Sequence, residues 1–364
     1  MNTTEILTSA TGSINYRREK FKTMLAKGIK ELLPGYFAMV MATGIISLAA
    51  YFQEINWLAY ALFAVNILFY IVLVILLIAR LIFFMPDFLN DFSDFSRGTG
   101  FFTTIAGTCI LGNQFVVISG KTGIGFFLWF LSLFIWIILI YGIFTAFLVR
   151  ENKPPLEKGI NGSWLVSIVA TQAVSVLGAL LSSRIGDHRE EMLFFSLTLW
   201  LFGGMLYIWI IMLIFQRYLF HRLEPSDLTP PYWINMGAVA ITTLAGDILI
   251  SQSGNSGILL TILPFIKGFT LFFWATATWW IPMLFVLGIW RHVFRKYKLS
   301  YDPQYWGAVF PLGMYTACTH RLSEVMHIEF LSFIPVFFIY IAIAAWILTF
   351  IGLLNQGWGG LKNI

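Results

Sequence analysis

Charge is the scarcest feature of this 364-residue sequence. Only 11% of its residues are charged, whereas 59% are hydrophobic and 18% aromatic, and the mean hydropathy is +0.80. A soluble globular chain carries about 25% charged residues and cannot hide this much apolar surface from water. The composition therefore excludes soluble enzymes, nucleic-acid binders and disordered regulators. It predicts an all-α polytopic membrane protein.

The sequence is equally poor in residues of reactive sites. Its two cysteines, Cys109 and Cys318, lie in apolar stretches, which suits buried thiols better than a disulfide or a metal site. Its five histidines are scattered, and the HExxH, GxSxG, P-loop and CxxC motifs do not occur. We therefore expect no enzyme activity, no metal and no cofactor.

Long apolar runs recur from residue 35 to residue 354. A window of about 19 residues predicts ten transmembrane helices, which cover 35–53, 57–84, 100–118, 123–149, 163–181, 192–216, 232–252, 259–290, 305–321 and 328–354. We expect one membrane domain at 34–355, a basic N-terminal segment at 1–33 and a short cytoplasmic tail at 356–364. The basic segment fits an amphipathic helix on the inner membrane surface or, equally well, a partly ordered tail.

The positive charges indicate how the chain is oriented. If the N-terminus is inside, the inner segments hold 18 of the 23 Lys and Arg residues and the outer segments hold 5. Positive residues stay on the cytoplasmic side of membrane proteins. The bias predicts a cell-membrane protein with both termini in the cytoplasm, and it accounts for the net charge of +5 without a nucleic-acid partner.

Odd-numbered and even-numbered spans differ in composition. Odd spans are short and rich in Gly, Ala, Ser and Thr, whereas even spans are longer and dense in Phe, Leu, Ile and Trp. Small residues permit close helix packing and bulky ones suit lipid, so we expect the odd helices inside. Each odd span also starts with an aromatic residue, and the spacings between these residues are 65, 62, 69 and 73 positions for Phe37, Phe102, Trp164, Trp233 and Trp306. The repeat predicts five helical hairpins with quasi-five-fold symmetry around a central pore, unless the aromatics only mark membrane boundaries.

Several motifs carry a resemblance to a known family. The first span, LPGYFAMVMATGIIS, resembles the opening of the tellurite-resistance/dicarboxylate transporter family, which includes bacterial tellurite-resistance proteins, malic acid transporters, sulfite pumps and plant slow-type anion channels. The similarity extends to RGTGFF before the third span and to YWGAVFPLGMY in the ninth. The resemblance implies ten helices in five hairpins, a pore through each protomer and a homotrimer. It also implies that a phenylalanine before a proline closes the pore, which matches Phe310 and Pro311.

The surroundings of Phe310 bear on the same role. It is an aromatic residue in a span otherwise made of small residues, and Pro311 removes a backbone hydrogen bond and permits a kink. A ring that projects into a passage about 5 Å wide blocks it by bulk and dewetting. The alternative is a ring packed between helices.

Charges inside the odd spans are few. Asp247 lies near the outer end of the seventh span, and His320 and Arg321 lie at the outer end of the ninth. An intramembrane charge is a functional hypothesis by default, so we assign these three residues to an outer vestibule. Asp247 and Arg321 also fit an ion pair at its rim, and His320 fits either a pH sensor or a hydrated boundary residue.

No Lys or Arg lies at the midplane of an odd span, where a carrier would be expected to hold a dicarboxylate. Hydroxyl and amide groups there can donate hydrogen bonds to a partly dehydrated anion. The candidate pore-lining residues are Thr43, Thr104, Thr108, Asn113, Thr171, Gln172, Thr242 and Thr243. Each can instead bond to a carbonyl of its own helix. Because conduction requires weak binding, this chemistry favours a channel.

Three functions fit the sequence. The first is passive, channel-type conduction of small inorganic anions or organic acids through a pore in each protomer gated by Phe310. The second is a secondary transporter of C4-dicarboxylates such as malate, of sulfite or of tellurite, with or without proton coupling. The third is a scaffold or sensor, which the polar inner helices disfavour. The expected partners are the permeant anions and membrane lipid.

Overall fold

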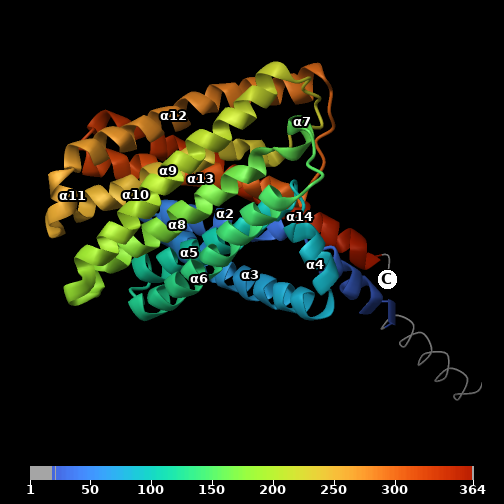
Figure 1. Ribbon diagram of the computed structural model, residues 1–364, viewed down its shortest axis with the longest axis horizontal. Coiled ribbons are helices and arrows are strands. Elements are labelled where there is room, and N and C mark those ends of the chain that lie inside the picture. Colours follow the sequence, from blue (N-terminus) through green and yellow to red (C-terminus); the bar gives the residue numbers. More distant parts are fainter. Residues whose placement is uncertain (1–18, 21, 363–364) are drawn as a thin grey trace, which may run out of the picture.

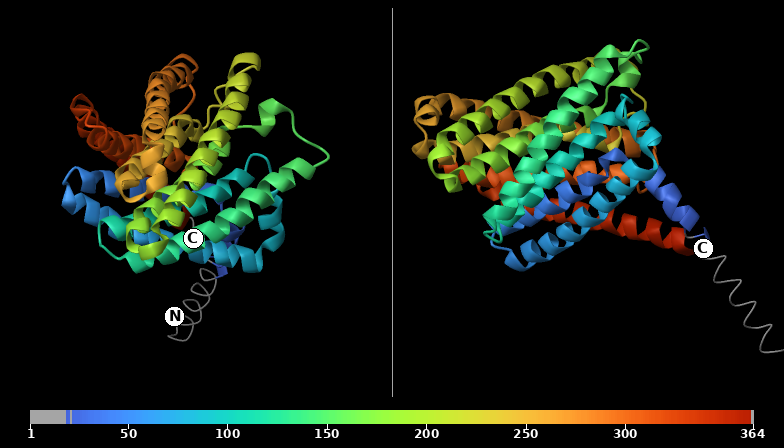
Figure 2. Two further views of the ribbon diagram at one scale, coloured as in Figure 1. Left: turned by 60° about the vertical axis from the view of Figure 1, so that its left-hand side comes forward. Right: turned by 60° about the horizontal axis from the view of Figure 1, so that its bottom comes forward.

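The protein is a single bundle of helices. The computed structural model describes residues 19–20 and 22–362, and that part contains no strand. Its long helices run side by side along the longest axis of the molecule (Figures 1 and 2). Most of the predicted basic segment, residues 1–18, lies outside the described residues, and so does the end of the predicted tail, residues 363–364. Residues 22–30 are helical.

Five inner helices each begin with a short 3₁₀ turn that continues into an α-helix. Proline occupies one of the first two positions of three of these turns, where its missing N–H group costs nothing. The inner helices are η1 (Pro34–Phe37) with α2 (Ala38–Phe52), η2 (Gly98–Phe101) with α5 (Phe102–Val117), η3 (Gly162–Leu165) with α8 (Val166–Leu181), η6 (Pro230–Trp233) with α10 (Ile234–Gln252), and η9 (Pro303–Tyr305) with α13 (Trp306–Val325).

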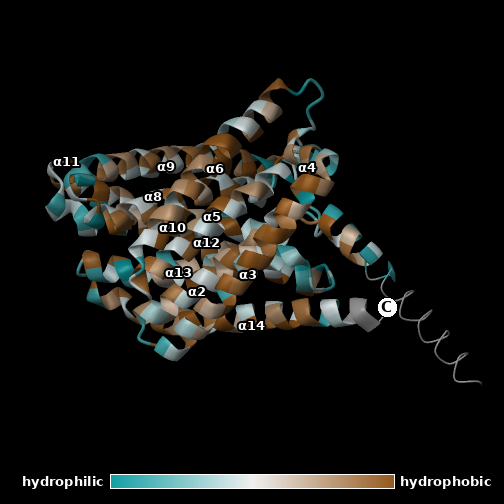
Figure 3. Ribbon diagram, turned by 90° about the horizontal axis from the view of Figure 1, so that it is seen from below, coloured by the Kyte–Doolittle hydropathy of each residue, from teal (hydrophilic) through white to brown (hydrophobic). Residues whose placement is uncertain are grey.

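Five longer helices follow them in the chain. These outer helices are α3 (Asn56–Phe83), α6 (Thr122–Val149), α9 (Arg189–Phe220), α12 (Leu263–Ile289) and α14 (Phe333–Lys362). Figure 3 shows hydrophobic residues along α3, α6 and α9 and hydrophilic residues gathered toward the two ends of the bundle. Outer helices cover inner ones, as composition predicted. In the most apolar stretch of each span, at least 78% of residues are buried for α2, α5, α8 and α10, against at most 50% for the outer helices.

The connections form short helices at the ends of the bundle. They are α4 (Met85–Phe92), α7 (Leu156–Gly159), η4 (Ser182–Arg184), η5 (Gly186–His188), η7 (Ser253–Asn255), α11 (Gly257–Thr261), η8 (Trp290–Phe294) and η10 (Glu329–Leu331). Figure 1 places α4, α7 and the end of α14 at one end of the bundle and α11 at the other.

The contacts between the inner helices close into a ring. Helix α2 contacts α5, which contacts α8, and the series continues through α10 and α13 back to α2. Each inner helix also packs against the outer helix that follows it in the chain. Within the described part of the chain, nine helices are long and apolar enough to cross a membrane, and α13 is not one of them because its second half is polar. Ten crossings and the quasi-five-fold axis therefore stay predictions.

Two predicted boundaries differ from the structure. The prediction of one continuous helix over 259–290 is wrong, because the chain leaves helical geometry at Ile262 and α12 restarts with Pro264 in its first turn. Helix α14 runs to Lys362, past the predicted end of the membrane domain at residue 355. The division into three segments stays a prediction.

Candidate functional site

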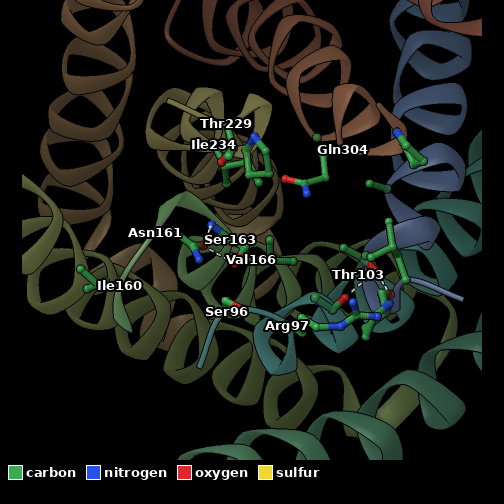
Figure 4. A pocket seen from close by; sticks show the side chains of 18 of the residues that line it. Ser96, Arg97, Thr103, Ile160, Asn161, Ser163, Val166, Thr229, Ile234 and Gln304 are labelled. Atoms are coloured by element: carbon green, nitrogen blue, oxygen red, sulfur yellow. Dashed lines mark hydrogen bonds between the residues drawn. The ribbon is translucent and has the colours of Figure 1, made fainter. Parts of the chain in front are cut away.

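Two cavities lie at opposite ends of the inner helices. The wide cavity measures about 540 Å³, and every inner helix contributes the start of its chain to its wall. Representative lining residues are Gly35, Arg97, Ser163, Ile234 and Gln304. Figure 4 shows side chains that surround this space, among them Arg97 just before η2, Ser163 of η3, Ile234 of α10 and Gln304 of η9.

The narrow cavity measures about 190 Å³ and is lined by the second halves of the same five helices. One lining residue from each is Ile45, Asn113, Val176, Leu244 and Arg321. Most of its wall is aliphatic, and Arg321 is the one charged residue of the described chain that lines it. Two cavities that share the same five walls define one axis through the protein.

The wall of the wide cavity is a ring of closely packed helix starts. The five 3₁₀ turns contact one another in the order η1, η2, η3, η6, η9 and back to η1. A Cβ atom added to Gly162 would lie 2.5 Å from the carbonyl oxygen of Pro231, and one added to Gly100 would lie 2.9 Å from the backbone nitrogen of Gly35. Glycine at these two positions therefore allows neighbouring helix starts to meet. The hydroxyls of Thr99 and Ser163 also lie 2.8 Å apart across the ring.

The backbone gives the wide cavity a positive field. All five helices present their N-termini to it, and each N-terminus carries about half a positive charge from its helix dipole. None of the five turns contains an acidic residue, and a carboxylate caps one of them: Asp302, just before η9, accepts a hydrogen bond from the backbone of Gln304 at 2.8 Å. Among the described residues, Leu33, Arg97 and Thr229 start their helices without a side-chain cap. The free backbone N–H groups of such uncapped helix starts attract anions without a fixed counter-charge.

Three cations line the wide cavity: Arg97 and Arg217 are paired with acids, whereas Lys158 has no ion-pair partner among the described residues. Nε of Arg97 lies 2.7 Å from the Asp91 carboxylate, and Nη2 of Arg217 lies 3.3 Å from that of Asp227. Asp94 accepts hydrogen bonds from the backbone of Ser96 at 2.9 Å and of Arg97 at 3.0 Å. Partial burial raises the pKa of Asp94, but these bonds and that from the Ser96 hydroxyl outweigh it, so its pKa is lowered. Lys158 and the helix N-termini other than that of η9 are thus the positive groups of this wall that no carboxylate of the described residues pairs with.

A closed segment separates the two cavities. On α2 the wide cavity ends at Ala38 and the narrow one begins at Ile45, and on α8 the corresponding residues are Val166 and Val176. At 1.5 Å per residue these intervals correspond to about 10–15 Å. The α2 and α8 residues between these positions are all buried.

Phe310 lies in this closed segment. It is wholly buried and follows Gly307, which lines the wide cavity, by three residues. It precedes Arg321, which lines the narrow cavity, by 11 residues, or about three helical turns, so the two side chains share one face of α13. Pro311 packs sideways against α10, where its Cγ atom would lie 2.7 Å from a Cβ added to Gly237. Phe310 thus lies on α13 between residues that line the two cavities, and its place on the axis and its role as a gate stay predictions.

Seven of the eight candidate pore-lining residues line neither of the two cavities. All eight are buried, and Asn113 is the one that lines a cavity within residues 22–362. Thr171 is five residues from both Val166 and Val176, which line the two cavities, and five residues turn a helix by about 140°. Thr108 bears the same relation to Thr103 and Asn113. These hydroxyls point away from the axis.

The threonine hydroxyls among the candidate pore-lining residues form hydrogen bonds within their own helix and with outer helices. Thr108, Thr171, Thr242 and Thr243 donate to carbonyls four residues earlier at 2.7–2.9 Å, which is the alternative that the sequence left open. The Nε2 group of Gln172 instead donates to the carbonyl of Trp200 on the outer helix α9 at 3.0 Å. A pore-lining role for these residues and for Thr104 stays a prediction.

Sequence reasoning missed five aromatic donors on the outer helices. Each contacts a hydroxyl or carbonyl of the next inner helix at 2.9–3.1 Å, and the pairs are Tyr70–Thr108, Trp136–Thr171, Trp200–Thr242, Trp274–Thr319 and Trp346–Thr43. The five donors are 66, 64, 74 and 72 residues apart. This near-constant spacing of Tyr and Trp in the even spans was the signal that could have identified them.

The predicted vestibule residues are divided between two surroundings. Arg321 pairs with Glu324 at 2.6 Å and not with Asp247, and its guanidinium lies 5.9 Å from the ring centre of Phe52. His320 stacks on Phe52 and lies 3.4 Å from Glu324. Asp247 is wholly buried on α10, and neither of its carboxylate oxygens has a hydrogen-bond partner among the described residues.

Comparison with known proteins identifies the family. The family model described as "SLAC1: Voltage-dependent anion channel" matches residues 31–354. The chain belongs to this family. The match confirms the resemblance seen in the sequence and places the protein among membrane channels and transporters of anions rather than enzymes.

Three relatives are similar to large parts of this chain. An uncharacterized transporter of Methanocaldococcus jannaschii is 26% identical over 339 residues, which cover 91% of this chain and 95% of that protein. A sulfite efflux pump of Trichophyton rubrum is 21% identical over 354 residues, covering 88% and 90%. An uncharacterized membrane protein of Mycobacterium tuberculosis is 37% identical over 151 residues, covering 42% of this chain and 76% of that protein.

The motifs that carried the resemblance to the SLAC1 family lie at the wide cavity. The residues of LPGY at the first span, Arg97 and Gly100 of RGTGFF, and Gly307 of YWGAV all line it. These motif residues therefore lie where the inner helices begin.

Proposed function

We propose that the chain conducts small anions passively along the axis of its inner helices, from the wide cavity past Phe310 to the narrow cavity. The observation that carries this proposal is the wall of the wide cavity, where five helix N-termini converge and the flanking arginines are paired with acids. Dipoles of this kind concentrate anions but hold them weakly, as conduction requires.

We also propose that ten helices cross the cell membrane as five hairpins, with both termini in the cytoplasm. The closed ring of inner helices and the five recurring aromatic contacts support quasi-five-fold symmetry. Helix α13 can cross despite its polarity, because protein rather than lipid surrounds it. It contacts α2, α10 and α14, and Trp274 of α12 donates a hydrogen bond to its Thr319. On this topology the wide cavity opens to the cytoplasm.

A homotrimer is the assembly that the family resemblance implies. The outer helices support association or lipid contact, because they expose large apolar side chains such as Trp209, Trp279 and Phe337. We keep the trimer as part of the proposal.

A secondary transporter is the second candidate. Its support is the closed segment of about 10–15 Å between two cavities, since alternating access requires one side to close before the other opens. Sulfite is one candidate substrate for such a carrier, because relatives that match most of this chain are described as sulfite efflux pumps. Malate and tellurite are the others.

Reconstitution into liposomes separates the two candidates. We expect a reversal potential that follows imposed gradients of chloride, nitrate or malate when no proton gradient is present. The potential should be absent in empty liposomes. Anion uptake that occurs only with a proton or counter-ion gradient would contradict passive conduction and support the carrier.

A further inference from the structure

The narrow cavity has two polar side chains in its wall, and one of them, Arg321, also pairs with Glu324 outside that wall. Arg321 is its one charged lining residue in the described chain, and Asn113 is its one amide. Asn113 is 4% exposed, and its side chain makes no hydrogen bond within the described residues, so its Nδ2 group is available to donate to an anion. The remaining wall is aliphatic or aromatic. A site of about 190 Å³ with one positive charge and apolar walls suits a monovalent, weakly hydrated anion better than a divalent one.

Asp247 lies directly behind this wall. It follows Leu244 by three residues and precedes Ile248 by one, and both of these line the narrow cavity. Arg321 is the charged lining residue of the cavity in front of Asp247, and its ion pair is with Glu324. A wholly buried carboxylate without a hydrogen-bond donor is costly in its ionised form, so the arrangement requires a proton on Asp247 or the approach of a cation.

The helices around α10 supply few other groups that titrate. Helix α13 carries Cys318, which the charge of Asp247 reaches, and the His320 and Glu324 side chains beside Arg321. At the same end of the bundle, Glu190 of α9 accepts a hydrogen bond from the backbone of Ile258, and Lys267 of α12 is half-buried. Helix α8 ends in the exposed Arg184 of η4. Arg321 is therefore the charge that an anion in the narrow cavity and an ionised Asp247 would share.

We propose that the narrow cavity binds one monovalent anion at Arg321 and Asn113, and that Asp247 takes up a proton when the anion binds. An ionised Asp247 repels the anion and competes for Arg321, whereas a protonated Asp247 does neither. The two bound species therefore favour each other, and by linkage each raises the affinity for the other equally. The effect changes occupancy and requires no proton to cross with each anion. The inference rests on the proposed anion passage.

Nitrate flux from proteoliposomes tests the linkage, because nitrate stays ionised throughout the pH range used. We expect wild-type flux to rise as the pH at the narrow cavity falls from about 8 to about 5, by at most tenfold per pH unit for one group. Asp247→Asn should show the high flux at every pH. Asp247→Ser should show the same and serves as the second variant if Asp247→Asn does not fold. Glu324→Gln, which removes the other partner of Arg321, should keep the pH dependence.

Infrared spectroscopy of the purified protein tests the same linkage without transport. Asp247 is the one wholly buried carboxyl in the described chain, so the C=O band of a protonated acid with slow hydrogen–deuterium exchange reports it. We expect this band in wild type, its loss in Asp247→Asn, and a titration midpoint that nitrate raises. A band that ignores nitrate, or equal pH dependence in wild type and Asp247→Asn, overturns the inference. Absence of nitrate flux at every pH with a nitrate-sensitive band would instead contradict the proposed conduction.

Discussion

Replacing Phe310 by alanine is the sharpest test of the proposed pathway. The ring is wholly buried in the closed segment, one helical turn beyond the wide cavity. Its removal creates no buried charge and breaks no backbone hydrogen bond. The space left exceeds the volume of about 10–15 Å³ that one water needs, and the adjoining cavity can supply that water.

The size of the effect follows from what the ring must do for an anion to pass. Pushing a close-packed aromatic into its neighbours costs about 1–3 kcal/mol, and this barrier disappears in the alanine variant. The corresponding increase in anion flux is about 5- to 150-fold. The stability cost is that of a large-to-small core substitution, about 3–5 kcal/mol if the space stays dry and less if water fills it.

Nitrate or chloride flux from liposomes, normalised to the amount of folded protein, measures this change. Phe115→Ala is the matched control. Phe115 lies two residues after the cavity-lining Asn113, so it points to the opposite face of α5, and its ring packs edge-on against Phe63 at 5.0 Å. Unchanged flux in well-folded Phe310→Ala, or an equal rise in Phe115→Ala, would show that Phe310 is a packing residue. Loss of coupled uptake in Phe310→Ala would favour the carrier.

Three further predictions address topology, assembly and packing. A cysteine placed at Glu157, which lines the wide cavity, should react with hydrophilic probes only from the cytoplasmic side, and one at the exposed Asp187 only from outside; swapped accessibility would refute the proposed orientation. Detergent-purified protein should have the mass of three 41.5 kDa chains by light scattering, and a clean monomer would contradict the trimer. Trp346→Phe removes the hydrogen bond to Thr43 and should lower the free energy of unfolding by about 1 kcal/mol. Trp358→Phe, at a site 66% exposed, should change the free energy of unfolding little, and equal effects on the two variants would argue against the bond.

Composition was enough to predict the arrangement of the helices. Small residues in one set of spans and bulky residues in the other follow directly from whether a helix contacts protein or lipid, and the buried inner helices agree with that prediction. The break at Ile262 escaped prediction because a window of about 19 residues averages over a single turn. Phe310 was predicted from the family resemblance and a local anomaly, and the structure places it between the cavities.

The rotational phase of each inner helix could not be predicted. A helix of small residues has no apolar stripe facing a known direction, so Thr171 and Ala173 look equally able to face a pore. The rotational phase of α8 becomes known only from the residues that line the cavities, and with that phase Thr171 faces Trp136. The expected ion pair between Asp247 and Arg321 is not the one that the structure shows. Glu324 lies three residues after Arg321 on the same helix, a spacing that permits contact, and Arg321 pairs with it instead.

The parallel direction of the inner helices links the fold to its proposed function. In an up-and-down bundle, neighbouring helix dipoles cancel at each end. Here an outer helix returns the chain after every inner helix, so the five N-termini of the inner set gather at one cavity and their C-termini at the other. The resulting field draws anions to the wide cavity and opposes their entry at the narrow one. Arg321, in the last turns of α13, offsets the negative ends there, which explains why the one charged residue of that wall in the described chain is a cation.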